Sequence, residues 1–528
     1  MLNRAAFFHP WLALTLLVVA AGALALRLPQ LDRRPMHNDE AVNAVLLQGL
    51  WERGVYQYNP DEYHGPALHY ATLPFVWLSG TPDFDHLSER TLRLVTVTAG
   101  VALVLLVGLL RDALGAAATA VAGVLLAVSP AMVFYSRYFI HEMLLVCFTL
   151  LLLAGAWRYH QTGKPGWAAL AGAGLGLMHA TKETFVITLA AMGFALAATV
   201  AWNRWRPPIP SGDRPAWNVR HLGLALGVAA AVSLFLFTSF FTHLRGPLDS
   251  VATYLPWIRR AGGHSPHIHP WHEYFERLLW FRSARGPLWT EAWIAVLALV
   301  GLGASLAGRG LGSSPVGFAR FLAFFTVMIT TAYSAIPYKT PWCLLNFWLP
   351  MILLAGIGAA VLMRWARRRP WQGCVGLLLA AGCAHLGWQA WRCSIEFANH
   401  RGNPYIYAQT VPNVLELTDR VQAIAGVNPE GVRTEIRVVA PESEYWPLPW
   451  YLRRLRNVWW LDTLPEEPYP PILIVGSGLK AALDEKSNRR WLNVGYYELR
   501  PREFFELYVE FELWKRFVAT LPRPKDDE

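Results

Sequence analysis

Long apolar stretches recur along the chain as far as Trp391 and then stop. Each has about 18–22 residues, which at 1.5 Å per helical residue is the length that crosses the core of a bilayer. We therefore predict eleven membrane-spanning helices, at residues 10–28, 92–110, 116–135, 138–157, 166–181, 184–202, 221–242, 288–307, 320–337, 342–363 and 372–392. An odd number of crossings places the two termini on opposite sides of the membrane.

Two of these helices share a nearly continuous apolar stretch, 166–202, which a short polar run at His179–Thr184 interrupts. We expect this run to form a tight turn facing outward. The spacing of three glycines, Gly172, Gly174 and Gly176, is similar to part of a nucleotide-binding loop. Within an apolar helix, however, such glycines favour close helix packing.

The pattern changes after Cys393, where short β-type runs alternate with helical or irregular segments. The expected strands are 435–439, 458–461 and 472–475. We predict a polytopic α-helical membrane domain over 1–393 and a soluble α/β domain over 394–528.

Basic residues in the short loops predict the orientation, because Lys and Arg near span ends are retained in the cytoplasm. They gather in alternate loops, which puts the N-terminus in the cytoplasm and the C-terminal domain outside: Arg111, Arg158, Lys164, Arg204, Arg206, Arg214, Arg220, Arg309, Arg320, Arg364, Arg367, Arg368 and Arg369. Two long loops, 29–91 and 243–287, then face outward; loops of this length cross largely regardless of their own charge. The first span, which could instead be a signal peptide, lacks a small-residue cleavage site, so we expect a retained anchor.

Composition agrees with an integral protein of the cytoplasmic (inner) membrane, since 54% of the 528 residues are hydrophobic and 16% are charged. The net charge of +10 fits retained cytoplasmic loops beside anionic lipids, so the bilayer is the expected partner and nucleic acid is not. The five cysteines lie in or at the ends of apolar spans without CxxC spacing, which argues against a disulfide framework.

An acidic pair, Asp39-Glu40, follows the first span directly. Carboxylates are costly near lipid, so the pair is a candidate functional site; the alternative is a pair of acids that stabilises the start of a helix. An amphipathic segment then runs from Ala41 to Arg53, and a second apolar segment ends at Trp77. We expect two interfacial helices on either side of a turn that carries His64.

The motif His64-Gly65-Pro66-Ala67-Leu68, together with the acidic pair, resembles the GT-C glycosyltransferases that use lipid-phosphate sugars. Protein O-mannosyltransferases and lipid A aminoarabinose transferases typify this superfamily, whose His/Lys-Pro-Pro-Leu motif has proline where this chain has Gly65. Further runs resemble a prokaryotic, flippase-activity-associated branch: Ala180–Thr184, Tyr338–Trp342, Asn403–Tyr405 and Tyr445–Arg453.

The resemblance implies inverting transfer of a sugar from a polyprenyl-phosphate donor to an acceptor, which could be a protein, a lipid or a glycan. Asp39 matches the catalytic acid position and would act as general base, while Glu40 would orient it or bind the acceptor. Positive charge near the bilayer surface would stabilise the departing phosphate. The cationic candidates are Arg137, Lys182 and Lys339, each of which could instead merely extend to the interface.

Other side chains complete the expected substrate site. Glu142 and Glu183 would hold the cations in place, and the remaining substrate-binding candidates are His64, Tyr338, His269 and Tyr274. The run His264, His267, His269, His272 and Glu273 also suggests a divalent metal, but its prolines impose an irregular loop. Contacts to acceptor or donor and ordinary surface histidines are the alternatives, so no metal is assigned.

Two other classes of function remain open from the sequence: a flippase or transporter of lipid-linked sugars, and a sugar-binding partner without catalysis. A transporter would be expected to show repeated halves and charges near the middle of its spans. Here the charges gather at one face, and no inverted repeat is apparent.

Overall fold

The computed structural model describes residues 10–208, 218–262, 267–283 and 285–522. The chain separates into two compact units. The first comprises residues 1–31, 49–80 and 90–407, and the second comprises residues 32–48, 81–89 and 408–528. The domain boundary expected after residue 393 stays a prediction.

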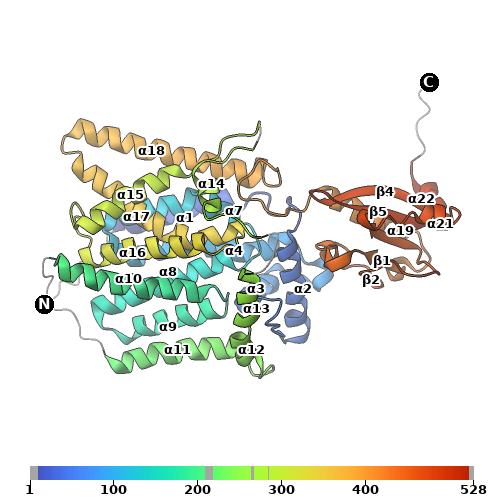
Figure 1. Cartoon of the computed structure of the whole chain (residues 1–528), viewed down its shortest axis with the longest axis horizontal. Helices are drawn as coiled ribbons and strands as arrows, with labels where there is room; N and C mark the ends of the chain where they lie inside the picture. Colours follow the sequence, from blue (N-terminus) through green and yellow to red (C-terminus); the bar gives the residue numbers. More distant parts are fainter. Residues whose placement is uncertain (1–9, 209–217, 263–266, 284, 523–528) are drawn as a thin grey trace. The chain divides into compact units, whose positions relative to one another are not determined.

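Every apolar segment expected to be helical contains a helix in the first unit (Figure 1). These helices are α1 (Pro10–Arg27), α4 (Glu89–Leu106), α6 (Ala116–Val128), α8 (Glu142–Thr162), α9 (Pro165–His179), α10 (Phe185–Trp205), α11 (Val219–Phe237), α15 (Ala292–Ala307), α16 (Val316–Ala335), α17 (Leu345–Trp365) and α18 (Arg369–Trp391).

Eight candidate membrane spans are long and apolar enough to cross a bilayer among the described residues, so the chain is an integral membrane protein with several spans. Helices α6, α9 and α15 are shorter. The prediction of one continuous helix over 116–135 is wrong: α6 ends at Val128, and α7 (Pro130–Tyr135) begins with a proline that has no N–H for an intrahelical bond. The crossing number of eleven stays a prediction.

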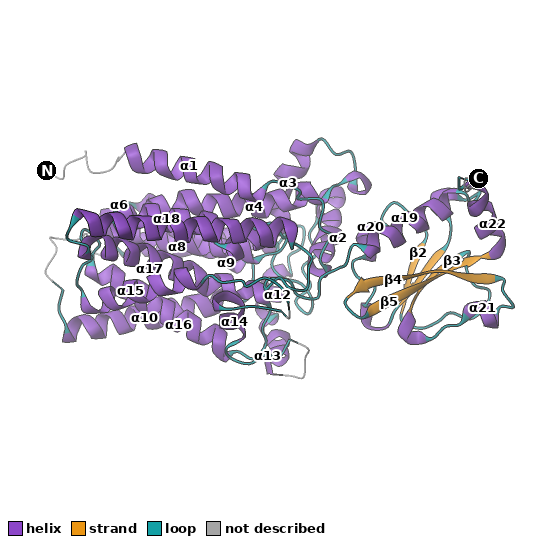
Figure 2. Ribbon diagram, turned by 90° about the horizontal axis from the view of Figure 1, so that it is seen from above, coloured by secondary structure: helices purple, strands orange, loops and turns teal. Residues whose placement is uncertain are grey.

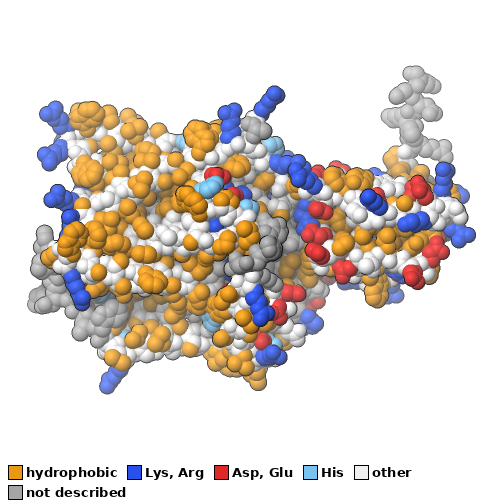
Figure 3. Space-filling model, in the orientation of Figure 1, with side chains coloured by type: hydrophobic (Ala, Val, Ile, Leu, Met, Phe, Trp, Pro, Cys, Tyr) orange, Lys and Arg blue, Asp and Glu red, His pale blue; other side chains and the backbone are white. Residues whose placement is uncertain are grey.

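Hydrophobic side chains cover much of the visible surface of the helical unit, and Lys and Arg side chains occur at its left-hand end (Figure 3). Burial differs sharply between helices: 94% of the apolar window of the α17 span lies inside the protein, against 6% for α11. Helix α17 is thus a core element, whereas few residues of α11 are fully buried, although the helix packs on α9.

Glycines bring several helices into backbone contact. A Cβ on Gly358 would lie 1.9 Å from the carbonyl oxygen of Leu297, where α17 packs on α15. The glycines of α9 behave as expected from the sequence, because a Cβ on Gly172 would lie 2.1 Å from the Ala225 oxygen of α11 and one on Gly174 would lie 2.8 Å from the backbone of α8. Close packing is therefore confirmed there.

Shorter helices lie between the spans. The helical segments expected in the first long loop are confirmed as α2 (Asn38–Arg53) and α3 (Ala67–Ser79). The second long loop forms α12 (Gly246–Ala252), α13 (Tyr254–Gly262) and α14 (Glu273–Leu279). Helices α3, α12 and α13 lie toward the same end of the helical unit (Figures 1 and 2).

The second unit contains a mixed five-stranded sheet of order β2-β1-β3-β5-β4 (Figure 2). Strands β1 (Ile436–Val439), β2 (Val458–Leu461) and β3 (Ile472–Gly476) are parallel and confirm the three expected strands. The antiparallel strands β4 (Trp491–Arg500) and β5 (Glu503–Glu510) were not expected. The helices of this unit include α19 (Asn413–Gly426), α20 (Leu448–Tyr451), α21 (Leu483–Lys486) and α22 (Phe511–Thr520), so the α/β class is confirmed.

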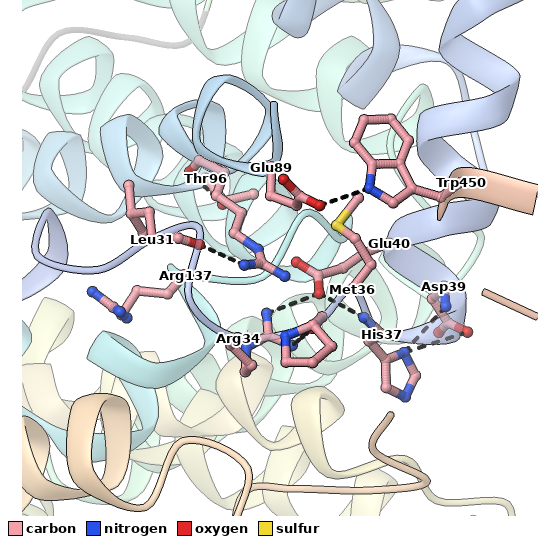
Figure 4. A network of polar contacts seen from close by, with 12 residues as sticks. Leu31, Arg34, Met36, His37, Asp39, Glu40, Glu89, Thr96, Arg137 and Trp450 are labelled. Carbon is pink, nitrogen blue, oxygen red and sulfur yellow. Dashed lines mark hydrogen bonds and ion pairs between the residues drawn. The ribbon is translucent and has the colours of Figure 1, made fainter. Parts of the chain in front are cut away.

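Segments from the beginning of the chain complete this second unit. The N–H of Met36 donates to the Tyr451 hydroxyl (2.7 Å), and the Trp450 indole N–H donates to Glu89 (2.8 Å; Figure 4). Arg453 also donates to the Leu87 carbonyl (2.7 Å). Residues 32–48 and 81–89 are therefore structural parts of the unit that carries the sheet.

Candidate functional site

Glu40 is the fully buried member of the acidic pair in the first turn of α2. Its carboxylate forms an ion pair with Arg34 at 2.8 Å and accepts a hydrogen bond from the backbone N–H of His37 at 2.9 Å (Figure 4). These contacts fix the chain where it enters the helix. They agree with a supporting role for Glu40 and with stabilisation of the helix start.

Asp39 differs from Glu40 in that its side chain is 44% exposed. Its carboxylate lies 3.9 Å from His37 Nδ1, and the same nitrogen accepts a hydrogen bond from the Asp39 backbone N–H at 3.1 Å. Of the two acids, Asp39 is the one that an acceptor group can reach. Its role as base stays a prediction.

Four predicted site residues of the first unit meet in two ion pairs, which we name the His64–Lys182 cluster: His64, Glu142, Lys182 and Glu183. His64 Nδ1 lies 2.9 Å from a Glu183 carboxylate oxygen, and Lys182 pairs with Glu142. Lys182, Glu142 and Glu183 are buried, whereas the His64 side chain is 23% exposed. The sequence expectation that acids hold these bases is supported by the pairing.

Backbone hydrogen bonds fasten the His64 turn to the polar turn between α9 and α10. The N–H of Gly65 donates to the Thr181 carbonyl (3.2 Å), and that of Ala67 donates to the Ala180 carbonyl (2.8 Å). A Cβ on Gly65 would lie 2.2 Å from the Ala180 oxygen. Glycine therefore stands in this motif because the position has no room for a side chain and uses its N–H, which proline lacks.

His141 and Trp257 pack around His64 and were not expected from the sequence. His141 Nε2 lies 3.1 Å from the Gly65 carbonyl oxygen, and its ring centroid lies 5.2 Å from that of His64. The Trp257 ring stacks on His64 at 5.0 Å with an interplanar angle of 22°. His141 could have been found from the sequence, because it adjoins the predicted site residue Glu142. Nothing in the local sequence pattern around Trp257 pointed to a role in the site.

The charges in this cluster follow from its burial and pairing. Burial alone would lower the pKa of Lys182, but the carboxylate of Glu142 outweighs it and raises that pKa above its ordinary value. Burial alone would raise the pKa of Glu183, but His64 and Lys182 hold it below its ordinary value. Burial, with His64, His69 and Lys182, lowers the pKa of His141 well below its ordinary value. The cluster keeps Lys182 and Glu183 charged and His141 neutral at pH 7.

Tyr58 extends the same cluster, because its hydroxyl donates to Glu183 at 3.4 Å. Burial and the Glu183 charge raise the pKa of Tyr58 well above its usual range, so it remains a hydrogen-bond donor. It was also missed from the sequence, where it stands in an ordinary loop segment.

Arg137 forms hydrogen bonds with the backbone that follows α1. Its guanidinium donates to the carbonyls of Arg27 and Pro29, each at 2.7 Å, and to that of Gln30 at 3.3 Å. These contacts support the backbone that leaves α1. Binding of a donor phosphate by Arg137 stays a prediction.

A second group of predicted residues gathers around Lys339 together with Tyr407, which was not expected from the sequence, and we name it the Lys339 cluster: His267, His269, Tyr338, Lys339 and Tyr407. The backbone N–H of Lys339 donates to the His267 carbonyl at 2.8 Å, and that of His269 donates to the Pro337 carbonyl at 3.0 Å. The Tyr338 ring lies 4.9 Å from His267, whose Nδ1 lies 2.5 Å from the Tyr407 hydroxyl. The cluster thus joins the second long loop to the segment before α17.

Lys339 itself is buried and donates to the Ile336 carbonyl. Burial lowers its pKa, which Glu273 partly opposes. Its ammonium lies 5.9 Å from the ring centroid of Tyr274, whose hydroxyl donates to the Thr340 carbonyl at 3.3 Å. Thr340 also lies 3.2 Å from the Cys343 sulfur, and Cys343 interacts electrostatically with Lys182. The two clusters are therefore neighbours in the first unit.

The histidine-rich run has no metal-binding geometry in the described part of the chain, where no group of three His, Cys, Asp or Glu side chains could hold an ion. His272 pairs with Glu276 at 2.6 Å, and Glu273 pairs with Arg277 at 2.7 Å. His264 lies outside the described residues.

Comparison with protein sequences finds partial matches. Residues 82–212 match the family model described as dolichyl-phosphate-mannose-protein mannosyltransferase. The protoheme IX farnesyltransferases of Roseiflexus sp. (strain RS-1) and Roseiflexus castenholzii (strain DSM 13941 / HLO8) are 38% and 34% identical over 97 residues, 17% of this chain. The chain spans 18% of the length of these curated relatives.

Comparison with solved structures covers nearly the whole chain. ArnT from Cupriavidus metallidurans matches with a TM-score of 0.62 in the apo state and 0.58 bound to undecaprenyl phosphate, at 15% identity, over 96% of this chain and 99% of that one. The apo oligosaccharyltransferase of Archaeoglobus fulgidus matches with a TM-score of 0.54 and 14% identity, over 86% of this chain and 65% of that one. The flippase-activity-associated branch stays a prediction. The chain has the ArnT-like fold, and its resemblance to the GT-C glycosyltransferases that use polyprenyl-phosphate sugars is confirmed.

Proposed function

We propose that this protein transfers a sugar from a polyprenyl-phosphate donor to an acceptor on the extracytoplasmic face of the membrane, with inversion at the anomeric carbon. The observation that carries the proposal is the His64–Lys182 cluster, which holds a buried cation, Lys182, beside Glu142 in the turn between α9 and α10. The basic loops of the sequence predict that this turn faces outward. The ArnT-like fold supports it, because one matching ArnT structure is bound to undecaprenyl phosphate.

Lys182 has the properties that a lipid-phosphate leaving group requires. Its ammonium is held in a low-dielectric setting by Glu142, and it stays charged because that carboxylate raises its pKa. A fixed positive charge in such a setting stabilises developing negative charge on the departing phosphate oxygen more strongly than it would in water. Lys339 is the second cation that we assign to the donor phosphate, with His64, Arg137 and Tyr338 as further donor contacts.

Asp39 is the proposed general base. As the acceptor oxygen or nitrogen attacks the anomeric carbon, it loses a proton, which a carboxylate within hydrogen-bond reach can take. Its 44% exposure leaves Asp39 open to an acceptor, whereas buried Glu40 is occupied by Arg34 and the His37 N–H. His269 and Tyr274 are assigned to sugar or acceptor contacts. No step in this scheme requires a metal.

The test uses purified full-length protein in lipid nanodiscs with a panel of polyprenyl-phosphate sugars and candidate protein, lipid and glycan acceptors. We expect Asp39→Asn to lower kcat by about 10²–10⁴-fold with little change in donor binding. The matched control is Asp462→Asn, an exposed acid of the same unit, which should retain wild-type turnover.

Equal turnover by wild type and Asp39→Asn would overturn the base assignment. If the wild-type protein binds donors but turns none of them over, the carrier or the non-catalytic sugar-binding function replaces the transferase. Movement of labelled donor across vesicle membranes then separates the two.

A further inference from the structure

The second long loop carries an apolar stripe along α12 and α13. Leu248, Val251, Leu255 and Ile258 recur at alternating spacings of three and four residues, which places them along one face of the helical segment, and Leu244 precedes them in the turn before α12. Their exposed fractions are 73, 68, 58, 69 and 73%, respectively. Four large exposed aliphatic side chains in one row, with a fifth just before them, are far more than the scattered apolar residues of a water-exposed surface.

The opposite face of the same segment packs inward against the His64–Lys182 cluster. Thr253 is buried, and its hydroxyl donates to the Pro60 carbonyl at 2.9 Å. Trp257 stacks on His64, and Tyr254 is close enough to Glu183 for that carboxylate to help raise the tyrosine pKa. The segment therefore has one face on the cluster and one row of aliphatic side chains facing away from it.

The stripe continues an outward apolar surface that begins on a membrane span. Helix α11 ends at Phe237 with only 6% of its apolar window buried, and Phe240 and Phe241, 58 and 54% exposed, follow before the stripe starts. Exposed arginines lie beside the row: Arg245, which also pairs with Asp249 at 3.1 Å, and Arg259. An aliphatic row with basic neighbours, continuous with a lipid-facing helix, matches the boundary between acyl chains and anionic headgroups.

We propose that α12–α13 docks on the outer leaflet of the bilayer, with Leu248, Val251, Leu255 and Ile258 inserted among the acyl chains and Arg245 and Arg259 at the headgroups. The lipid surface thereby holds the inner face of the segment in place and keeps Trp257 stacked on His64. The bilayer is thus a structural partner of the His64–Lys182 cluster as well as the solvent of the spans.

The test measures the surroundings of single nitroxide labels in full-length protein in nanodiscs of phosphatidylethanolamine and phosphatidylglycerol. The background carries Cys374→Ser, since Cys374 is the exposed cysteine of the described residues. Labels are placed by Val251→Cys, Leu255→Cys and Ile258→Cys. Leu226→Cys, on the outward surface of α11, is the lipid reference, and Glu430→Cys, exposed in the second unit, is the aqueous reference.

We expect the ratio of collision with oxygen to collision with a water-soluble nickel chelate to be several-fold higher at the three stripe positions than at 430, and to approach that at 226. A ratio equal to the aqueous reference overturns the proposal. Protection from both oxygen and the chelate also overturns it, since the stripe would then be covered by a protein partner or a second copy.

A second measurement tests the link to the cluster and rests on the proposed function. Leu255→Glu with Ile258→Glu should raise the donor KM several-fold and leave kcat within about twofold, while Val432→Glu, an exposed aliphatic position of the second unit, should change neither. An unchanged donor KM would contradict the positioning of Trp257 by lipid. If wild-type protein shows no turnover, the proposed function fails, and the collision ratios still decide whether α12–α13 docks on lipid.

Discussion

Glu183 joins the first long loop to the turn between α9 and α10 through one buried carboxylate. It pairs with His64 of the first long loop and accepts a hydrogen bond from Tyr58, and it follows Lys182 in the turn between α9 and α10. A buried acceptor with this many partners fixes the positions of the groups around it. Removal of the Glu183 carboxylate should therefore lower both the stability and the activity of the protein.

Replacing Glu183 with glutamine should lower the free energy of unfolding at pH 7 by about 1–3 kcal/mol, since His64 loses its charged partner. The wild-type carboxylate has a pKa below the ordinary value of 4.5. Its contribution is therefore complete above pH 4.5 and is lost as pH falls through the folded-state pKa. The difference in free energy of unfolding between wild type and variant, measured by denaturant unfolding in detergent, should decrease below pH 4.5.

The control for that series is Glu62→Gln, an exposed acid of the same loop, which should leave the unfolding curve nearly unchanged. If the difference in free energy of unfolding between wild type and Glu183→Gln stays constant from pH 7 to pH 3.5, a charged Glu183 is ruled out as the source of the stability.

Gly65 gives a second residue-scale prediction. Gly65→Ala puts a Cβ 2.2 Å from the Ala180 carbonyl oxygen, so the two turns must separate, at a cost of about 1–3 kcal/mol. Gly166→Ala is the matched control, because its Cβ would meet nothing within 4 Å. Thermal unfolding should show a lower midpoint for the first variant and no decrease for the second; equal midpoints would mean that the turn yields without cost.

Sequence alone identified much of the His64–Lys182 cluster at the scale of single residues. Each member stands next to a span end or a Gly-Pro break, where a charged or imidazole side chain is conspicuous. Trp257 and Tyr58 could not be found in this way, because aromatic residues near span ends are common and their contacts depend on how separate loops pack. Arg137 illustrates the reverse case: its charge was conspicuous, but its hydrogen bonds support the backbone after α1.

Helix α17 depends at the scale of elements on backbone contact with α15. The Cβ of Gly358→Ala would lie 1.9 Å from the Leu297 oxygen, and neither helix backbone can yield locally. We expect a loss of about 1–3 kcal/mol and a lower thermal midpoint in detergent. Gly303→Ala, on an open face of α15, should be neutral. Indistinguishable midpoints would show that the two helices can separate freely.

The helices were predictable because apolar length is a strong local signal, and all the expected apolar segments contain a helix. The break at Pro130 was missed because the surrounding residues remain apolar on both sides of the proline. Strands β4 and β5 were missed because Trp491–Arg500 mixes polar and aromatic residues without clean alternation, and the strand forms through its pairing with β5. Such strand pairing depends on long-range contacts, which the local composition does not reveal.

The make-up of the second unit restricts the membrane topology of the whole molecule. Segments 32–48 and 81–89 belong to the same compact unit as 408–528, so all three must lie on one side of the membrane. An even number of crossings must then separate residue 89 from residue 408. The described long candidate spans after α1 number seven; if all seven cross, an odd number of the shorter helices α6, α9 and α15 must also cross. Ten crossings after α1, as the sequence predicts, satisfy this condition.

Reporter fusions test this topology. Alkaline phosphatase fused after Glu528 should be active and a fluorescent protein fused there dark, whereas a fluorescent protein fused before Met1 should fluoresce. The physical reason is the odd total of eleven crossings with basic loops retained in the cytoplasm. Fluorescence at both ends would contradict the predicted topology.

The division of the second unit into three pieces of chain also sets the order in which it can be completed. Met36, Leu87 and Glu89 emerge early in synthesis, but their partners Tyr451, Arg453 and Trp450 follow only after the spans have been made. At usual rates of translation this interval is on the order of tens of seconds. During this interval, the two early segments lack their hydrogen-bond partners. A nascent chain that stops before residue 408 never contains those partners.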